Sequence, residues 1–427
     1  MTAAEATTEG PGVRAMLIAS VPALLIGAGS ALVLWVIDML AHGLQHWLWD
    51  TLPAQFGASS TTPWWIFVVL TAVGLLVGAV VQFAPGRGGV DSATVELNAP
   101  PPPILAVPSI VIAVTLSLAG GVSLGPENPI IAINSALAVT LLAGMSKVLP
   151  PQLVILLAIS GTIGALFATP VAAALVLTGT VGAMRGPGSL WDKLFLPLAA
   201  AGAGAVTMHL LGGESIAFTL EPMGEIQPMY LVLGFVVAAA SAGVGILAAW
   251  LFPYLHRAFH SLKHPIVFTT LGGAVLGVLG IIGGPLTLFK GLNETGELLT
   301  HPDAYSAGQL ALFAGVKVVA LLVAASAGFR GGRIFPAVFI GTALGLLGYA
   351  LIPGIPIALA VACGVMGITL AATKDGWMAM FIGVVLVGDV TVLALLCIIV
   401  LPVWLLVTKA PELVVHPAPH EKAQVAS

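Results

Sequence analysis

Two long apolar tracts of this chain are each interrupted by a short segment that is rich in glycine and proline and carries charge. The first segment, 125–129, reads GPENP and places Glu127 between two prolines. The second, 328–336, reads GFRGGRIFP and lies at a comparable place in the later half of the chain. Charged residues at membrane depth usually mark functional sites, and helices broken at matching positions mark the binding sites of transporters. The two segments therefore predict where a transported solute binds.

The apolar tracts have the length that a bilayer requires. Four of them, at 15–41, 64–83, 229–252 and 390–407, approach or exceed the ~20 residues that a spanning helix needs. Only 7% of the 427 residues are charged, whereas soluble domains carry about 25%. We therefore expect an all-α, multi-pass membrane protein in which glycine and proline make several helices short, tilted or broken.

Composition also excludes several classes of partner and cofactor. The net charge is −4 and no basic run could follow a phosphate backbone, so we expect no nucleic acid partner. Cys363 and Cys397 lie in apolar segments, away from any CxxC or Cys/His cluster. We interpret both as small buried hydrophobic residues. The sequence thus predicts no metal site, no disulfide and no cofactor.

One transmembrane domain is expected at 15–408, between a cytoplasmic tail at 1–14 and a short C-terminal tail at 409–427. The first apolar run lacks a small-residue cleavage site, so we expect it to remain as a helix. The linker 212–228 has three glutamates and no lysine or arginine, and we expect it outside. Basic residues close to helix ends predict that other linkers face the cytoplasm; these residues are Arg185, Lys193, Arg257 and Lys263.

An internal repeat becomes visible when the two broken segments are aligned together with the motifs C-terminal to them. The segment 161–170, GTIGALFATP, comes after the first break, and 364–373, GVMGITLAAT, comes after the second. Nearly the same number of residues separates Pro129 from Pro170 and Pro336 from Gly376. We therefore expect two related halves, at about 15–211 and 229–408, in inverted orientation. Such an arrangement brings broken helix ends together near the middle of the bilayer.

Both breaks have the features of an anion site. Pro126 and Pro129 suit a first helical turn, where the missing N–H is not needed. The unpaired N–H groups and the dipole of a helix N-terminus attract anions. We therefore expect backbone groups of both breaks to bind an anion, aided by the positive charge of Arg333; the candidates are Gly125, Asn128, Ile130, Gly332, Arg333, Ile334 and Phe335.

Glu127 would then place a carboxylate where the anion binds, and it could act as a tethered anion that leaves when it is protonated. Burial favours the neutral form of Glu127, and the helix dipole favours the charged form. The alternative is that Glu127 only caps its helix.

The other charged residues also have structural alternatives. Arg330 and Arg333 could simply reach a cytoplasmic surface. Arg87, in a third glycine-rich segment that leads into a short helix, has the same alternative, and Asp91 could be an N-cap there. Lys317 could hold an anion, pair with a carboxylate or snorkel. Asp38 and Asp389 are expected to make short polar links to helix ends.

The broken segments resemble those of the CLC family of chloride channels and transporters. The resemblance rests on GG at 120–121 with GPENP at 125–129, and on GGRIFP at 331–336 followed by Gly341, and it covers nearly the whole chain. A small bacterial branch of the family shares GGVSLGPE, GTIGALF and GFRGGRIFPAVF with this chain. It implies inverted halves, an anion site at helix ends, and a homodimer in the bacterial inner membrane in which each subunit has its own pore. It also implies that Glu127 holds the position of the gating glutamate.

The chain departs from the usual family pattern at several positions. Pro126 replaces a basic residue, Asn128 replaces a glycine, and Arg87 stands where an anion-coordinating serine is usual. The pore tyrosine near the C-terminus has no counterpart, and Thr180 stands where exchangers have an inner glutamate. Arg87 and Thr180 are therefore candidates for lining an altered pore.

These features predict a membrane protein that transports chloride or another small anion and is not an enzyme. A fluoride-selective channel or exchanger is the alternative within the same family, because one branch handles fluoride with altered versions of these motifs. Two other classes are weaker. An intramembrane hydrolase would need Asp38 and Asp389 to share a proton, and a non-transporting scaffold would leave Glu127 unexplained.

Overall fold

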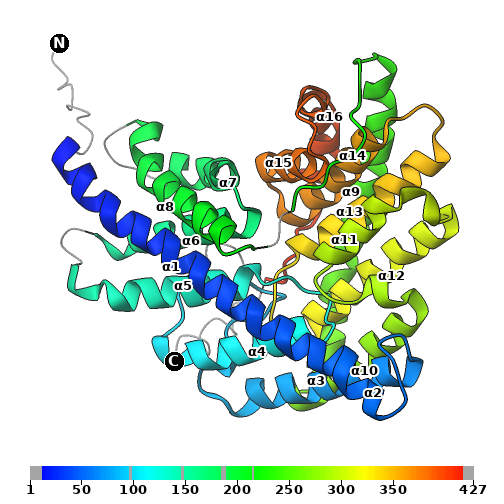
Figure 1. The fold of residues 1–427 in the computed structure, drawn as a ribbon, viewed down its shortest axis with the longest axis horizontal. Coiled ribbons are helices and arrows are strands. Elements are labelled where there is room, and N and C mark those ends of the chain that lie inside the picture. Colours follow the sequence, from blue (N-terminus) through cyan, green and yellow to red (C-terminus); the bar gives the residue numbers. More distant parts are fainter. Residues whose placement is uncertain (1–11, 96–98, 146–148, 184–188, 214–215, 417–427) are drawn as a thin grey trace. The chain divides into compact units, whose positions relative to one another are not determined.

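The computed structural model describes residues 12–95, 99–145, 149–183, 189–213 and 216–416 (Figure 1). Over those ranges the regular structure is helical, and the one extended pairing is an isolated β-bridge. Seven of the described helices are long and apolar enough to cross a membrane. This confirms the predicted all-α, multi-pass membrane protein.

The helices are arranged along the chain in two series of similar order. The first series is α1 (Val13–His46), α2 (Leu52–Gln55), α3 (Pro63–Phe83), α4 (Val107–Ala119), α5 (Glu127–Leu141), α6 (Pro151–Phe167), α7 (Pro170–Ala183) and α8 (Leu190–Leu210). The second series is α9 (Met229–His260), α10 (Pro265–Gly283), α11 (Leu292–Thr300), α12 (Ala307–Ser326), α13 (Ile334–Leu351), α14 (Ile357–Thr373), α15 (Gly376–Val387) and α16 (Val392–Val407). Each predicted break begins in a loop between helices and ends in a first helical turn, that of α5 or that of α13.

The helix ends define the register of the repeat. Pro129 and Pro336 are each the third residue of their helix, α5 and α13. Helices α6 and α14 are each 17 residues long, and each ends at a residue in the left-handed region, Ala168 at φ +52° and Lys374 at φ +56°. This register pairs Gly161 with Gly367. The sequence motifs predicted the pair Gly161 and Gly364, which is wrong by about one helical turn, because Gly364 and Gly367 lie three residues apart and the letters fit either register.

Packing agrees with the corrected register. A Cβ atom added to Gly161 would lie 2.7 Å from the Cα of Gly27 in α1. A Cβ atom added to Gly367 would lie 2.2 Å from the carbonyl oxygen of Ala238 in α9. Each glycine thus lets its helix approach the first helix of its own series, as small residues do in membrane helix packing.

The chain divides into two compact units, one from Met1–Val36 and Ile130–Ser215, the other from Ile37–Pro129 and Ile216–Ser427. In the first unit, α6 and α8 pack closely through Gly164, whose added Cβ would lie 2.2 Å from the carbonyl oxygen of Ala201. A small apolar cluster of this unit includes Ala23, Leu157 and Ala200.

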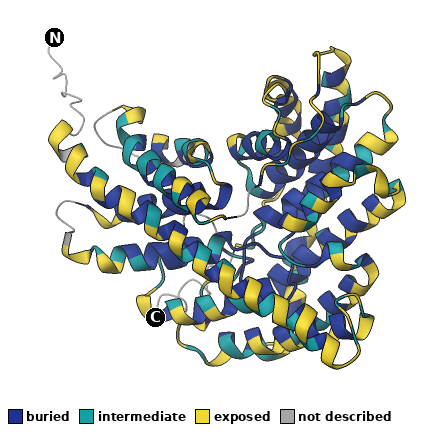
Figure 2. Ribbon diagram, viewed as in Figure 1, coloured by how far each residue is buried: buried dark blue, intermediate teal, exposed yellow. Residues whose placement is uncertain are grey.

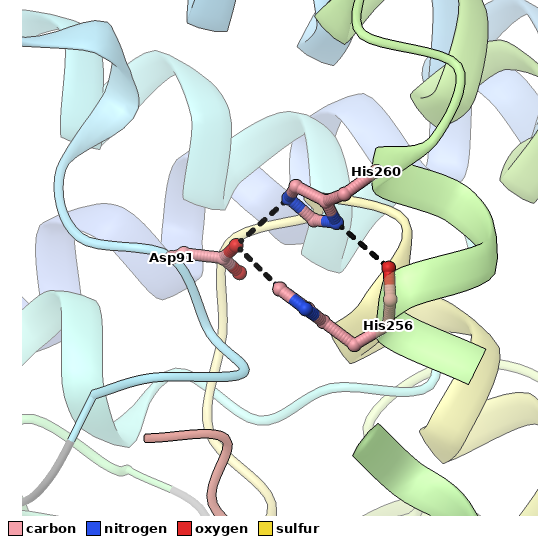
Figure 3. Close-up of side chains that lie close together, drawn as sticks. All are labelled: Asp91, His256 and His260. Carbon is pink, nitrogen blue, oxygen red and sulfur yellow. Dashed lines mark hydrogen bonds and ion pairs between the residues drawn. The ribbon is translucent and has the colours of Figure 1, made fainter. Parts of the chain in front are cut away.

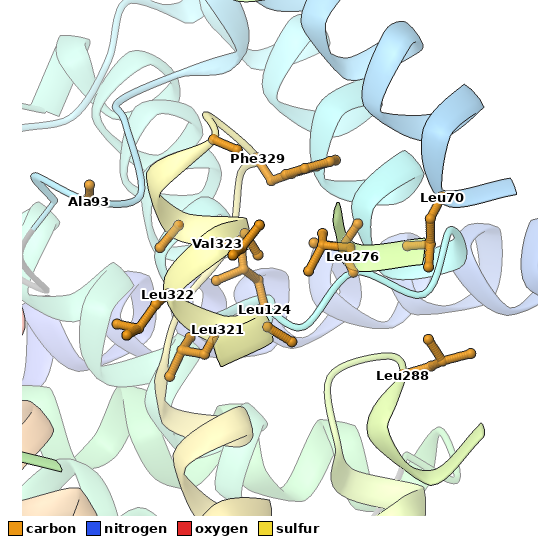
Figure 4. Close-up of a cluster of buried hydrophobic side chains, with 14 of the residues drawn as sticks. Leu70, Ala93, Leu124, Leu276, Leu288, Leu321, Leu322, Val323 and Phe329 are labelled. Carbon is orange, nitrogen blue, oxygen red and sulfur yellow. The ribbon is translucent and has the colours of Figure 1, made fainter. Parts of the chain in front are cut away.

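The second unit holds a large apolar cluster that covers the two loops before α5 and α13 (Figure 4). It joins α3 and α10 to α12, and Leu70, Leu276 and Phe329 are among its buried members. Helix α3, from the first series, packs closely against α10, from the second, because a glycine of α10 leaves room for the α3 backbone. A Cβ added to Gly273 would lie 2.3 Å from the carbonyl oxygen of Leu70. Figure 2 shows that the helix faces turned toward this cluster are buried and that many outer faces are exposed.

Segments outside the helices also pack in this unit. Of the predicted C-terminal tail at 409–427, the structure describes residues to His416. Leu413 is buried, and the N–H of Val415 donates a 2.8 Å hydrogen bond to the carbonyl of Ala93. Residues 1–11, in the predicted N-terminal tail, and Arg185, used in the predicted orientation, lie outside the described residues.

Candidate functional site

The loops before α5 and α13 cross each other at two glycines. The N–H of Gly125 donates to the carbonyl of Gly332 at 2.8 Å, and the N–H of Gly332 donates to the carbonyl of Gly125 at 2.6 Å. The preceding helix α4 ends nearby at Ala119, whose carbonyl accepts a 2.9 Å hydrogen bond from Nε1 of Trp49. This reciprocal bridge brings the N-termini of α5 and α13 together, as the repeat predicts.

The Glu127 carboxylate lies at this crossing. Glu127 is the first residue of α5 and is 1% exposed. Its Oε1 accepts a 2.9 Å hydrogen bond from the N–H of Phe335, in the first turn of α13. The backbone N–H groups of Ile334 and of Glu127 itself also interact with the carboxylate. Its Oε2 is buried and has no hydrogen-bond partner among the described residues. Glu127 therefore caps α13 as well as beginning α5.

Only glycine can occupy the positions beneath this carboxylate. A Cβ added to Gly332 would lie 1.9 Å from Oε2 of Glu127, and one added to Gly125 would lie 2.4 Å from the same atom. No side chain fits at such distances, so the two glycines let a carboxylate rest directly on the backbone.

The engaged glycine N–H groups correct one expectation. The backbone N–H groups of Gly125 and Gly332 were expected to bind an anion, but each is donated to the other loop. The N–H of Gly331 is also engaged, donating to Oγ of Ser92 at 2.9 Å. The structure instead places the first turns of the two helices, which contain Asn128, Ile130, Ile334 and Phe335, next to the crossing.

Ser92 was not identified from the sequence. Its Oγ donates a 2.7 Å hydrogen bond to the carbonyl of Phe329 and accepts from Gly331. Together with Leu124, Gly332 and Arg333, it lines a small cavity beside the crossing. One sequence signal pointed to Ser92. Arg87 stands where the family usually has a serine, and Ser92 is the next serine in the chain.

The two arginines of the second break donate hydrogen bonds to backbone carbonyls of the 87–95 segment. Nη2 of Arg333 donates to the carbonyl of Val95 at 2.7 Å. Arg330 is buried, and its Nη2 donates to the carbonyl of Arg87 at 3.2 Å. Both donate to backbone carbonyls of the 87–95 segment; Arg330 is buried, which contradicts the surface alternative for it, whereas Arg333 is half-buried.

The surface alternative does describe the Arg87 side chain, which is exposed. Its backbone lies at φ +51°, in the left-handed region that a non-glycine residue rarely adopts. The segment after it was expected to begin a short helix. The described residues instead form a single turn at Asp91, whose Oδ1 accepts the N–H of Ala93 at 3.0 Å as an N-cap would.

Lys317 is fully buried and binds backbone oxygens. Its Nζ donates to the carbonyls of Thr287, Leu288 and Phe289 at 3.1, 2.7 and 2.8 Å. This lysine therefore anchors the loop that carries Lys290, whose Nζ lies 3.9 Å from Oδ1 of Asp38. A second cavity, lined among others by His42, Phe289, Lys290 and Glu294, opens beside this ion pair.

The two isolated intramembrane aspartates have different partners. Asp389 accepts the backbone N–H groups of Met223 at 2.8 Å and Thr391 at 2.9 Å. This confirms the predicted polar link to a helix end. Asp38 instead faces Lys290. Thr180 belongs to α7, but its side chain is outside the described residues, so its candidate role in the pore stays a prediction.

Comparison with known proteins identifies the family to which this arrangement belongs. The sequence profile described as voltage gated chloride channel matches residues 68–403. The chain belongs to the voltage-gated chloride channel (CLC) family. The match includes both broken segments, so the crossing of the two loops lies within the region that the family shares.

Relatives of this CLC chain extend over nearly its whole length. Proteins named "Putative ion-transport protein YfeO" from Escherichia coli strains 55989 and K12 DH10B are each 44% identical to it over 407 residues. These alignments cover 95% of this chain and 97% of each relative.

Solved structures share the fold at much lower identity. A CLC-type fluoride/proton antiporter aligns with a TM-score of 0.72 at 18% identity, covering 94% of this chain and 98% of the antiporter. A slow cyanobacterial Cl⁻/H⁺ antiporter aligns with a TM-score of 0.76 at 15% identity, covering 92% and 95%. At such identities the likeness concerns the fold alone.

Proposed function

We propose that this protein transports a small anion, chloride in the first instance, along a path that passes the N-termini of α5 and α13, with Glu127 as the gate. One observation carries the proposal. A buried carboxylate rests against Gly125 and Gly332 and accepts the N–H of Phe335 at 2.9 Å.

The surroundings of Glu127 favour an anion over a cation. Two helix N-termini contribute partial positive charge, about +0.5 of an elementary charge each. Lys290 interacts electrostatically with Glu127 and lines the cavity beside Asp38. Arg333 lines the cavity that also includes Ser92. A bound anion would therefore have the cationic side chains of Lys290 and Arg333 near the loop crossing.

The gate would work by competition for one position. An ionised Glu127 places its own negative charge at the N-terminus of α13 and excludes a second anion. A protonated Glu127 is neutral and loses most of its attraction to the helix dipole. The side chain can then leave, and the anion takes over the N–H of Phe335.

Fluoride is the alternative anion. One structure with the same fold is titled a fluoride/proton antiporter and another a Cl⁻/H⁺ antiporter. The resemblance places Thr180 where exchangers have an inner glutamate, so we propose that any proton exchange here does not use that route. We also propose that the protein resides in the bacterial inner membrane as a homodimer with one pore in each subunit.

The other classes have less support. The carboxylates of Asp38 and Asp389 contact different groups, which disfavours a proton shared between them. A non-transporting scaffold does not need a buried carboxylate between two helix N-termini, so this alternative leaves Glu127 unexplained.

The decisive experiment measures anion efflux from proteoliposomes that contain the purified protein. Vesicles loaded with potassium chloride, and parallel vesicles loaded with potassium fluoride, are diluted into a low-halide buffer. Valinomycin is added alone in one arm and with a protonophore in the other, which separates uncoupled flux from proton-coupled flux. Wild type is compared with Glu127→Gln and with Glu221→Gln, a matched substitution of an exposed loop glutamate.

The expected result is halide efflux in wild type that changes in Glu127→Gln and is unaltered in Glu221→Gln. Efflux of fluoride without chloride would select the fluoride alternative. Absence of both fluxes in all three proteins would reject transport. Equal flux in wild type and Glu127→Gln would reject Glu127 as the gate.

A further inference from the structure

Three side chains that can bind metals meet away from the Glu127 site. His256 and His260 lie one turn apart near the end of α9, and both face Asp91 (Figure 3). Oδ2 of Asp91 lies 3.3 Å from Nε2 of His256 and 3.3 Å from Nε2 of His260. The three ligand atoms all lie within 4.8 Å of one another.

The hydrogen bond that His260 makes to a backbone carbonyl determines which of its ring nitrogens carries the proton in the neutral ring. Its Nδ1 is 3.0 Å from the carbonyl oxygen of His256. Because a carbonyl oxygen can only accept, Nδ1 carries the proton in that bond. In a neutral imidazole Nε2 then has a lone pair, which points toward a carboxylate oxygen of Asp91. In that neutral form two acceptors face each other, and either a metal ion or a second proton on Nε2 would relieve the repulsion.

We propose that Asp91, His256 and His260 bind a divalent transition metal ion of the zinc type through Oδ2 and the two Nε2 atoms. Zinc binds nitrogen and oxygen ligands at about 2.0–2.2 Å in tetrahedral geometry, which separates neighbouring ligand atoms by about 3.3 Å. Both Asp91–histidine distances, at 3.3 Å, match this separation. Two histidines four residues apart on a helix are also a familiar zinc-binding arrangement.

The hydrogen-bond partners of the proposed ligands are of the kind found around metal ligands in proteins. Metal-bound histidines usually donate their second N–H to a carbonyl or carboxylate, as Nδ1 of His260 does. The other carboxylate oxygen, Oδ1 of Asp91, is held by the N–H of Ala93 at 3.0 Å and lies 3.8 Å from Nη1 of Arg330.

The cluster is accessible to an ion from solution. The side chains of His256, Asp91 and His260 are 14%, 23% and 35% exposed. Solvent can therefore deliver the metal and supply a fourth ligand, as in zinc sites with three protein ligands.

A bound ion would also stabilise the loops near the crossing. Asp91 immediately precedes Ser92, whose Oγ bonds both the carbonyl of Phe329 and the N–H of Gly331. Fixing Asp91 to α9 would hold the loop that carries Gly332. This part of the inference concerns folding stability and does not depend on anion transport.

The test is direct metal binding to the full chain in detergent, with any affinity tag removed and residual metal stripped by a chelator. Zinc binding is measured by calorimetry, and cobalt binding by the visible absorption of the tetrahedral complex. His260→Gln and His256→Gln are compared with His264→Gln, a substitution of an exposed histidine four residues after His260. The melting temperature is recorded with and without zinc for each protein.

We expect one zinc ion per chain, a tetrahedral cobalt spectrum and a zinc-dependent rise in melting temperature. Each ligand substitution should weaken binding by at least ~10-fold, and His264→Gln should not change it. Zinc affinity in His256→Gln/His260→Gln equal to that of wild type would overturn the proposal. The proposal would also be overturned if a wild-type protein that unfolds cooperatively bound no zinc. A proton on Nε2 of His260 would then explain its contact with Asp91.

Discussion

The N–H of Phe335 donates a 2.9 Å hydrogen bond to Oε1 of Glu127, a residue 208 positions earlier in the chain. This bond joins the N-terminus of α13 to the first residue of α5. It forms because Gly125 and Gly332 bring the two loops into backbone contact. A carboxylate thereby occupies a position that two helix dipoles would offer to an anion.

The contact between Gly332 and Glu127 predicts the effect of a single added methyl group. Gly332→Ala would place its Cβ 1.9 Å from Oε2 of Glu127, so the carboxylate must move. We expect anion flux to change in the same direction as in Glu127→Gln. Overpacking of this kind typically costs about 1–3 kcal/mol of folding stability. Flux assays and thermal unfolding of the purified variant measure both effects.

A double variant shows whether the clash is with the carboxylate. In Glu127→Ala the carboxylate is absent, so adding Gly332→Ala should cost less stability than it does in wild type. An equal cost in both backgrounds would show that the alanine clashes with other atoms. Gly308→Ala, at a position where an added Cβ meets no atom within 4 Å, is the control.

The proposed gate predicts how flux depends on pH. When pH falls, protonation removes the negative charge of Glu127, and the helix N-termini hold the side chain less strongly. Flux should therefore rise on acidification of the side from which Glu127 is reached. Glu127→Gln cannot ionise, so its flux should vary far less with pH. A wild-type pH profile that persists unchanged in Glu127→Gln would assign the titration to another group.

The ion pair of Lys290 and Asp38 predicts opposite effects of two neutral substitutions. Lys290→Gln removes a positive charge that interacts with Glu127 and should lower anion flux. Asp38→Asn removes the negative charge 3.9 Å from Lys290 and should raise it. Salt screens such effects, so both differences should shrink between about 0.01 M and about 1 M ionic strength. Changes of the same sign in both variants would contradict this electrostatic role.

Lys317 is expected to be essential for stability. Lys317→Met keeps the apolar stem but leaves the carbonyls of Thr287, Leu288 and Phe289 without their charged donor. An unsatisfied buried polar group typically costs about 1–3 kcal/mol. We expect a clear fall in melting temperature, measured in detergent. Lys409→Met is the control, because that lysine is exposed; equal melting temperatures would show that water replaces the Lys317 contacts.

The sequence pattern predicted one part of the repeat correctly and another part incorrectly. Matching prolines correctly predicted that the breaks before α5 and α13 correspond, because proline has a position of its own in a first helical turn. The glycine motifs were aligned about one turn out of register. Each helix has two glycines three residues apart, Gly161 and Gly164 in α6 and Gly364 and Gly367 in α14, so the letters cannot distinguish Gly364 from Gly367. Packing distinguishes them, since Gly367 contacts Ala238 of α9.

The cluster of Asp91, His256 and His260 was missed at the level of sequence. No CxxC motif or Cys/His cluster points to it, whereas the spacing of His256 and His260, four residues apart on a helix, was a usable signal. Asp91 could not have been added from the sequence, because it lies 165 residues before His256. Only the packing of the loop after α3 against α9 brings the carboxylate to the two rings.

The sequence by itself determined that this is a multi-pass helical membrane protein of the CLC family with two broken helices and one buried carboxylate. Bilayer thickness, backbone hydrogen bonding and the positions of proline and glycine dictate those features locally. The tertiary structure decided which backbone N–H groups are already engaged, that Ser92 holds Gly331, and that Arg330 and Arg333 bind loop carbonyls. These outcomes depend on contacts between segments more than 200 residues apart, which no local pattern specifies.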